Sequence, residues 1–485
     1  MAVDISRVSF DPSKHYSQLI HQQGRVTLDA DANEQAAVLL HYLRTVVADL
    51  LGPAACPEAA PGFSVTLVEK APDRDFAIGP GRLYVDGLLV ENDHPTTYLS
   101  QPEGFVDPDA AAVPVGPFIA YLRAWEREIT AIQDPSIREI ALGSAGPDTA
   151  ARAKVVWQVA LYGFGDEDPG SEGAAAALRA WLDGLHRPPG LMAAQARHDG
   201  TRPTEACTIS PQARFRGPEN QLYRVQIHTS GVGAATGYGE TALQAVPAAR
   251  QKTSAKGKPT GPDVATFVWS RENASVAVPV VSVAGPVVTV AAWGRDSRLG
   301  LDVGDLVELV DDATAVHAAD DVASAPPQGI HRIVAVDVPG RTVTLDADPH
   351  AAPGWGPPPL TVSGDPELHP YLRRWDHRPP RGSQPLPVVL DTWIPLEDGV
   401  EVRFAGRPDP VPNPKKGGKP SRFRRGDHWL VPARAIPGDV LWPQAEDGPA
   451  PVPPHGVAYR YAPLAYVPAQ GDPVSLVPHF KPLFP

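Results

Sequence analysis

Apolar residues recur with the period of an α-helix in a segment near the start of the chain. Between Asp31 and Leu51, the i, i+3, i+4, i+7 positions of one helix face are occupied by Ala36, Leu39, Leu40, Leu43, Val46, Val47 and Leu50. Asp29 or Asp31 can cap the start of this helix, and Gly52-Pro53 ends it. We therefore predict one long N-terminal amphipathic helix of about twenty residues, ~30 Å in length. Its apolar stripe packs either on a sheet of its own domain or on a neighbouring subunit.

Most other apolar positions have the alternation and the β-branched composition of strands. A small β-meander is predicted from strand segments at 63–68, 76–78, 82–85 and 88–91, with turns at Gly79-Pro80-Gly81 and Asp86-Gly87. Further strands are expected at 118–128, 155–162, 222–228 and 266–270. Residues 230–263 are rich in Gly, Ala and Lys and predict a long loop.

A more regular series of short strand segments occupies residues 275–348. The segments lie at 287–290, 304–311, 329–337 and 341–346, and Gly-Asp turns separate several of them. Short strands at such even spacing are typical of small closed sheets. The segment therefore predicts a small SH3-like or OB-like barrel.

Length and composition favour a mainly β, multi-domain protein. A chain of 485 residues is too long for one hydrophobic core, and its 57 prolines cannot lie in helix interiors or central strands. We divide it into an attachment module of helix and meander (1–100), a β module with a low-complexity insertion (101–190), a β segment with the long loop (191–274), the barrel (275–348) and a Pro-rich C-terminal β module (349–485).

Charge, cysteine content and hydropathy restrict the classes of partner. A net charge of −13 argues against nucleic acid as a main partner, because phosphate binding needs a basic surface. Cys56 and Cys207 are too few for a disulfide framework, and two buried thiols are favoured over one bridge. The N-terminal residues contain no apolar leader, and no run of 18 apolar residues occurs. We expect cytoplasmic synthesis and assembly without membrane insertion, which is compatible with later release on an extracellular particle.

A polar corner precedes the predicted helix. Arg25 offers a guanidinium fork suited to a carboxylate, and Asp29, Asp31 and Glu34 follow within a short distance. The cluster either fixes the strand-to-helix corner or faces a partner subunit. The residues that we select as candidate assembly contacts are Arg25, Asp29, Asp31, Asn33, Glu34, Leu39 and Leu43.

A basic loop is unusual in a chain of this net charge. It contains Lys415, Lys416, Lys419, Arg422, Arg424 and Arg425. Such a loop is either solvated or docks on an acidic partner by electrostatic steering.

The sequence contains no established catalytic or cofactor-binding motif. Gly231-Val232-Gly233 follows a strand, but no amphipathic helix follows it, so a dinucleotide site is not expected. A metal site at His369, His377 and His428, beside Asp376, Asp391 and Asp427, fits no known ligand spacing. A sugar-cleaving site could be assembled from Asp391, Trp393, Glu397 and Glu401, although tryptophans in β proteins more often fill cores. We expect no enzyme activity, no cofactor and no metal.

Several stretches together resemble one uncharacterised bacterial family found beside extracellular contractile injection systems, which are phage-tail-like particles with a sheath, a tube and a baseplate. The stretches are Gln22-Gln23-Gly24-Arg25 with Leu28 to Glu34, Glu219 to Val225, Phe267 to Asn273, Arg374-Trp375-Asp376, Gly426 to Leu430 and Tyr461 to Ala465. Residues 24–34, with Pro80-Gly81-Arg82-Leu83-Tyr84-Val85-Asp86-Gly87, are also similar to the proximal parts of phage baseplate and tail-fibre proteins. Ala32 stands where those relatives often carry tryptophan.

The resemblance implies a non-enzymatic structural or accessory component, associated with the baseplate or a fibre, whose partners are other subunits of the particle. A homo-oligomer is compatible with this role. The alternatives are a receptor- or glycan-binding fibre-like protein of the same apparatus and a carbohydrate-active enzyme. A trimeric fibre shaft is not supported, because the chain has no long heptad stalk or collagen-like repeat.

Overall fold

The computed structural model describes residues 2–68, 75–105, 113–114, 116–143, 148–163, 178, 180–184, 190–196, 214–234, 264–294, 296, 298–317, 329–350, 366–379, 382–406 and 422–481. Two compact units form, and both are discontinuous in sequence. Unit 1 combines Met1–Arg7, Glu128–Arg152 and Pro188–Val457, and unit 2 combines Val8–Arg127, Ala153–Arg187 and Ala458–Pro485. The five modules expected from the sequence were contiguous segments, whereas each of these units draws on three separate stretches.

Unit 2 contains the predicted long helix, α1 (Asp29–Leu51), after a single 3-10 turn, η1 (Pro12–Lys14). One four-stranded sheet has the order β29 (His479–Phe480), β1 (Ala54–Pro57), β4 (Gly81–Val85), β5 (Leu88–Asn92). The predicted hairpin at Asp86-Gly87 joins β4 to β5. A three-stranded sheet has the order β2 (Val65–Val68), β3 (Asp75–Ile78), β6 (Thr96–Thr97).

A second four-stranded sheet of unit 2 uses the longest strands. Its order is β28 (Val474–Ser475), β27 (Arg460–Val467), β7 (Phe118–Ile129), β8 (Arg152–Gly163). Alternate side chains of β7, β8 and β27 enter the core of this unit, where Phe118 and Trp157 join Phe63 and Phe76. The buried thiol of Cys56 lies in the same core, and burial raises its pKa. Cys207 lies outside the described residues, so the expected pair of buried thiols stays a prediction.

Unit 1 contains two sheets that share one apolar core. The larger has the order β19 (Leu386–Pro387), β12 (Thr266–Ser270), β10 (Gln221–Thr229), β23 (His428–Arg434), β24 (Asp439–Val440). The smaller has the order β20 (Trp393–Pro395), β21 (Val400–Gly406), β9 (Gly190–Ala196). Their inward side chains include Trp269, Trp429, Tyr223 and Phe404, so these tryptophans fill a core.

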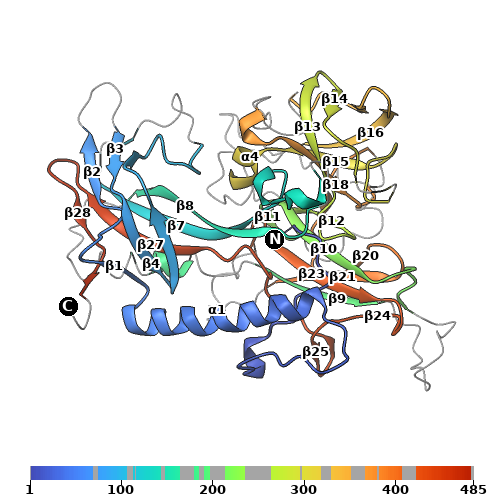
Figure 1. Cartoon of the computed structure of the whole chain (residues 1–485), viewed down its shortest axis with the longest axis horizontal. Helices are drawn as coiled ribbons and strands as arrows, with labels where there is room; N and C mark the ends of the chain where they lie inside the picture. Colours follow the sequence, from blue (N-terminus) through green and yellow to red (C-terminus); the bar gives the residue numbers. More distant parts are fainter. Residues whose placement is uncertain are drawn as a thin grey trace. The chain divides into compact units, whose positions relative to one another are not determined.

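The barrel of unit 1 is closed by six strands in the order β13 (Ala277–Ala284), β14 (Val287–Val290), β17 (Thr342–Leu345), β16 (Ile330–Asp337), β15 (Leu306–Val310), β18 (Tyr371–Trp375) (Figure 1). The sequence pattern located four of them, β14, β15, β16 and β17, whereas β13 lies in the predicted barrel segment but was not identified as a strand. The sixth strand, β18, comes from the segment that we had assigned to the C-terminal module, and it pairs with both β13 and β15.

Short elements complete unit 1. They are the strand pairs β11 (Gly231–Val232) with β22 (Arg422–Phe423) and β25 (Gln444–Ala445) with β26 (Gly448–Pro449), the helix α4 (Asp312–His317), and the 3-10 turns η2 (Pro135–Ile137), η3 (Ile140–Leu142) and η4 (Pro366–Leu368). The barrel packs on β12 through an apolar cluster in which Val268 and Ala2 meet Leu306, Ile330 and Trp375.

Helix α1 approaches the β4–β5 turn closely at one glycine. Gly87 has a φ of +76°, and a Cβ added to it would lie 2.1 Å from the carbonyl oxygen of Arg44 in α1. Gly52, which ends α1, has a nearly identical φ of +75° with open space around it. A Cβ at Gly52 would therefore add only backbone strain, whereas a Cβ at Gly87 would add the same strain and also a clash with Arg44.

We predict that Gly52→Ala lowers the free energy of unfolding by about 1 kcal/mol through strain alone, whereas Gly87→Ala lowers it by at least about 2 kcal/mol more. Urea unfolding followed by circular dichroism measures both values. Equal costs for the two variants would show that α1 does not pack tightly on this turn.

Candidate functional site

Helix α1 begins at the polar corner singled out in the sequence. The Oδ2 atom of Asp31 accepts a hydrogen bond from the Leu28 N–H at 3.1 Å, which satisfies one backbone donor at the helix start. Asp29 also lies in the first turn, where the helix dipole favours negative charge. The segment before the helix lies alongside it, because the Leu19 N–H donates to Gln35 Oε1 at 2.8 Å. The corner therefore organises the start of α1.

The inner face of α1 consists of small residues. Ala30 and Val38 are buried, at 1% and 5% exposure, and Ala37 and Ala48 are partly buried. Arg44 on this side forms an ion pair with Glu126 of β7, with 2.7 Å between Nη2 and Oε1. The C-terminal part of α1 lies beside β1 and β4 (Figure 1). Small side chains allow the helix backbone to approach the strands.

Most of the predicted apolar stripe of α1 is exposed in the part of the chain that the structure describes. We call this stripe (Ala36, Leu39, Leu40, Leu43, Val46, Val47 and Leu50) the outer face. Leu39, Leu43 and Leu50 are 58%, 57% and 78% exposed, and only the two valines are partly buried. Tyr42 beside the stripe is also exposed. The sequence left open whether the stripe packs on its own domain, and among the described residues only its two valines are partly covered.

The polar residues among the candidate assembly contacts differ in their surroundings. Asp31 caps the helix, and Glu34 is partly buried. Asn33 and Arg25 are exposed, and among the described residues Arg25 forms no ion pair with the neighbouring carboxylates. The expected Arg25–carboxylate fork is therefore not what fixes the corner. A surface-facing role for Arg25, Asn33, Leu39 and Leu43 stays a prediction.

The basic loop is only partly within the described residues. Lys415, Lys416 and Lys419 lie outside them, and only the backbone of Arg422 is described, in β22. Arg424 is partly buried, with its Nε 3.5 Å from Asp427 Oδ2. Arg425 is buried, and its N–H donates to Ser230 Oγ at 2.8 Å. Arg425 is thus held in the interior rather than displayed for docking.

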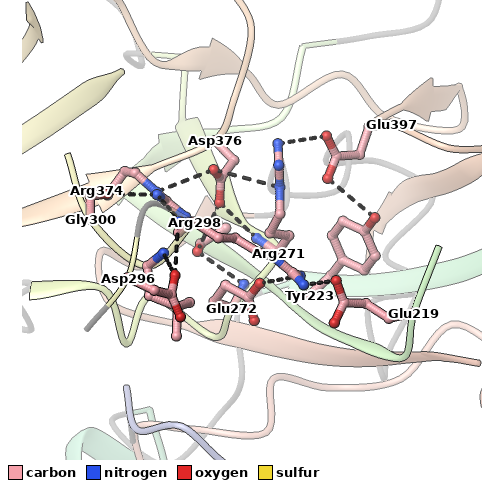
Figure 2. A network of polar contacts seen from close by, with 12 residues as sticks. Glu219, Tyr223, Arg271, Glu272, Asp296, Arg298, Gly300, Arg374, Asp376 and Glu397 are labelled. Carbon is pink, nitrogen blue, oxygen red and sulfur yellow. Dashed lines mark hydrogen bonds and ion pairs between the residues drawn. The ribbon is translucent and has the colours of Figure 1, made fainter. Parts of the chain in front are cut away.

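A polar network forms where the barrel meets the larger sheet of unit 1, and its centre is the carboxylate of Asp376, directly after β18. Asp376 Oδ2 accepts hydrogen bonds from the Ser270 hydroxyl at 3.1 Å and from the Arg271 N–H at 2.9 Å. Asp376 Oδ1 lies 3.6 Å from the Nε atoms of both Arg271 and Arg374. Figure 2 shows Asp376 and Glu397 on opposite sides of the Arg271 guanidinium.

The network extends from Arg271 to the β20–β21 turn. Arg271 Nη2 lies 2.9 Å from Glu397 Oε2, and the Tyr223 hydroxyl donates to Glu397 Oε1 at 3.2 Å. On the barrel side, Arg374 Nη1 donates to the carbonyl oxygens of Arg298 and Gly300 at 2.7 and 2.8 Å. Arg298 in turn contacts Glu219 and lies 2.8 Å from Glu272 Oε1. The barrel, the sheet and the turn are therefore joined by charged hydrogen bonds.

Burial determines the protonation of this network. The side chains of Asp376 and Glu397 are 7% and 9% exposed. Burial raises the pKa of Glu397 and of Glu272, although Arg271 lowers both. Burial lowers the pKa of Arg271, but the carboxylates of Asp376 and Glu397 outweigh this and raise it. Arg271 therefore stays charged, and the carboxylates of Asp376 and Glu397 each accept a further hydrogen bond, from Ser270 and Tyr223 respectively.

Three of the stretches used for the family resemblance meet in this network. They are Glu219 to Val225, Phe267 to Asn273 and Arg374-Trp375-Asp376. These stretches stand out in the sequence, but the sequence does not indicate which residues Arg271 and Arg374 contact. Polar residues at the ends of predicted strands could have indicated a polar site. The pairing of Arg271 with Asp376, however, depends on closure of the barrel by β18.

The residues of the hypothetical sugar-cleaving site have separate partners. Glu397 belongs to the network, and Glu401 Oε2 accepts from Gln195 Nε2 of the neighbouring strand at 3.2 Å. Trp393 is covered by the guanidinium of Arg403, 4.9 Å from the ring centroid. Asp391 is exposed in the left-handed region, with a φ of 55°. No contact within the described residues brings these four side chains together.

The three histidines considered as metal ligands are also separated by their partners. His369 Nδ1 lies 2.8 Å from Asp312 Oδ2, whereas His428 Nδ1 lies 3.2 Å from the carbonyl oxygen of Gly426. His377 is 2% exposed, and burial lowers its pKa to about 4. The part of the chain that the structure describes contains no group of three or more His, Cys, Asp or Glu residues placed to hold a metal ion. No helix within it is long and apolar enough to span a membrane.

Comparison with known proteins gives one family. The model of a family described as a family of unknown function, DUF6519, matches residues 1–187 and 163–480. No curated protein matches the chain. No solved structure matches it either.

We predict that Asp376→Asn lowers the free energy of unfolding of unit 1 by about 3 kcal/mol, because it leaves Arg271 and Arg374 without their shared carboxylate. Denaturant unfolding monitored by tryptophan fluorescence measures this loss. Asp391→Asn is the matched control, since an exposed Asn tolerates the same φ and should change stability by less than about 0.5 kcal/mol. A small effect at Asp376 would mean that the network does not hold the barrel.

Acid should destabilise unit 1 through His377. The pKa of His377 is about 4 in the folded chain and 6.5 in a model peptide, so the unfolded chain binds the proton first. Stability should therefore fall as the pH falls from 6.5 to 4, by up to about 3 kcal/mol from this group. His377→Gln should lose less stability than the unsubstituted chain in thermal unfolding across this range, and exposed His350→Gln should not. Identical pH profiles for all three proteins would refute the assignment.

Proposed function

The chain belongs to the family of unknown function DUF6519, and we propose that it is a non-enzymatic structural or accessory component of a phage-tail-like contractile injection particle, associated with the baseplate or a fibre. It would act by binding a neighbouring subunit, either another protein of the particle or a second copy of this chain, through the outer face of α1. Synthesis and assembly would take place in the cytoplasm, as the sequence analysis expected.

The observation that carries this proposal is the direction of the apolar stripe. Burial of a leucine side chain contributes about 1.5–3 kcal/mol, and a surface helix normally turns such a face to its own core. Helix α1 instead buries Ala30 and Val38 and leaves Leu39, Leu43 and Leu50 in water. An apolar face maintained at the surface favours a protein partner.

The remaining polar groups are compatible with a structural role. The carboxylates that a hydrolase would need are engaged: Glu397 by Arg271 and Tyr223, and Glu401 by Gln195. The injection-particle context comes from the resemblance of residues 24–34 and 80–87 to the proximal parts of baseplate and tail-fibre proteins. Those residues form the start of α1 and the β4–β5 hairpin that packs on it, so the resemblance and the outer face concern the same region of the chain.

The proposal predicts that the chain co-sediments with contractile particles isolated from the producing cells. A Leu39→Glu/Leu43→Glu variant should remain in the supernatant, at least tenfold depleted from the particle fraction, because two charges would have to be buried in the contact. Quantitative immunoblotting of the gradient fractions measures this.

The matched control is Ile436→Glu, which changes an apolar residue of unit 1 that is 85% exposed. It should co-sediment normally, and circular dichroism should show that all variants are folded. Absence of the unsubstituted chain from particles that are otherwise complete would contradict the proposal.

A further inference from the structure

Part of the outer face of α1, together with Ala32 one turn before it, has the period of a coiled coil. Ala32, Ala36, Leu39, Leu43, Val46 and Leu50 are separated alternately by four and three residues, which is the spacing of the a and d positions of a heptad. We call these six residues the seam. All of them are exposed except Val46, which is partly buried. The seam therefore has the pattern of a helix–helix contact, and most of it is exposed in the described part of the chain.

We propose that the seam pairs with the seam of a second copy of this chain, with the two helices antiparallel. The inference rests on the proposed function only in taking the outer face as a protein-binding surface, and it identifies the partner that covers this face.

The spacing of the seam makes it self-complementary. The intervals 4-3-4-3-4 are the same in both directions along the helix. A two-fold axis that crosses the seam at the level of residue 41 therefore aligns the two seams over nearly the whole of α1. Ala32 would then face Leu50, Ala36 would face Val46, and Leu39 would face Leu43. The two pairs nearest the ends of the seam, Ala32 with Leu50 and Ala36 with Val46, each combine a small residue with a larger one. A parallel pair would instead place Ala36 against Ala36 and leave a poorly filled layer.

Charge also permits pairing between identical chains. The chain carries a net charge of −13, so a contact between two copies must avoid opposing carboxylates. The seam contains no charged residue, and in the antiparallel pair the flanking Asp49 would face Gln35 of the second copy, whereas Asn33 would face its Val47. Leu40 and Tyr42 would each face their own counterpart across the axis. Antiparallel helices also oppose their dipoles favourably.

Sedimentation equilibrium of the full chain over a range of concentrations tests the pairing. We expect the unsubstituted chain to have the mass of two chains in the micromolar range. Leu39→Glu/Leu43→Glu should be at least 100-fold weaker in association and monomeric under these conditions, whereas Ile436→Glu should match the unsubstituted chain. A monomeric unsubstituted chain at ~100 μM, or a dimer that survives both glutamates, would overturn the inference.

Cysteine cross-linking tests the orientation. The double variant Ala36→Cys/Val46→Cys should form a disulfide-linked dimer under mild oxidation, and the single variant Ala36→Cys should not. The unsubstituted chain, with its native Cys56 and Cys207, serves as the control for background cross-linking. Efficient dimerisation of the single variant would indicate a parallel pair and would overturn the antiparallel arrangement.

The two proposals fail in different ways. A monomeric chain whose particle association still depends on Leu39 and Leu43 would refute self-pairing and leave the proposed function intact. A seam-dependent dimer that never enters particles would support self-pairing and refute the proposed function.

Discussion

The architecture of unit 1 depends on the buried carboxylate of Asp376. It follows the last barrel strand and accepts hydrogen bonds from Ser270, the last residue of β12, and from Arg271, which follows that strand. Through Arg271 it is linked to Glu397 of the β20–β21 turn, and through Arg374 to the loop around Gly300. A buried charge is tolerated only when it is paired and hydrogen-bonded, so this arrangement favours one relation between barrel and sheet over any other.

Helix α1 shows the converse of a paired buried charge, because it leaves apolar side chains exposed to water. Unit 1 pairs the buried carboxylates of Asp376 and Glu397 with donors of the same chain, whereas α1 exposes most of its apolar stripe among the residues that the structure describes. Its inner side is small enough for close contact with the β4–β5 turn at Gly87, and its larger residues, Leu39, Leu43 and Leu50, are in water. The free energy available from burying them can be recovered only on contact with another surface. The helix is thus positioned by one face and able to bind by the other.

Local features were predictable from the sequence, and long-range ones were not. The 3.6-residue period of apolar residues located α1, because this pattern lies within one continuous segment. The period alone does not tell whether the apolar stripe of the helix faces a core or the solvent. Even strand spacing located four barrel strands, whereas Tyr371–Trp375 follows a Pro-rich stretch that interrupts the spacing. The discontinuous units depend on pairs such as Ile119 with Tyr466, which join distant segments of the chain. The Asp376 network was missed for the same reason: Arg271, Asp376 and Glu397 meet only after the barrel closes.

The central claim is that the outer face of α1 is a protein contact. Hydrogen–deuterium exchange of residues 36–50 tests it most directly, compared between the dilute, isolated chain and the assembled state. We expect the backbone amides of this segment to exchange at least tenfold more slowly after assembly, with little change in the barrel strands. Unchanged exchange across 36–50 in a chain that has demonstrably assembled would contradict the account, because assembly would then leave the apolar face of α1 in water.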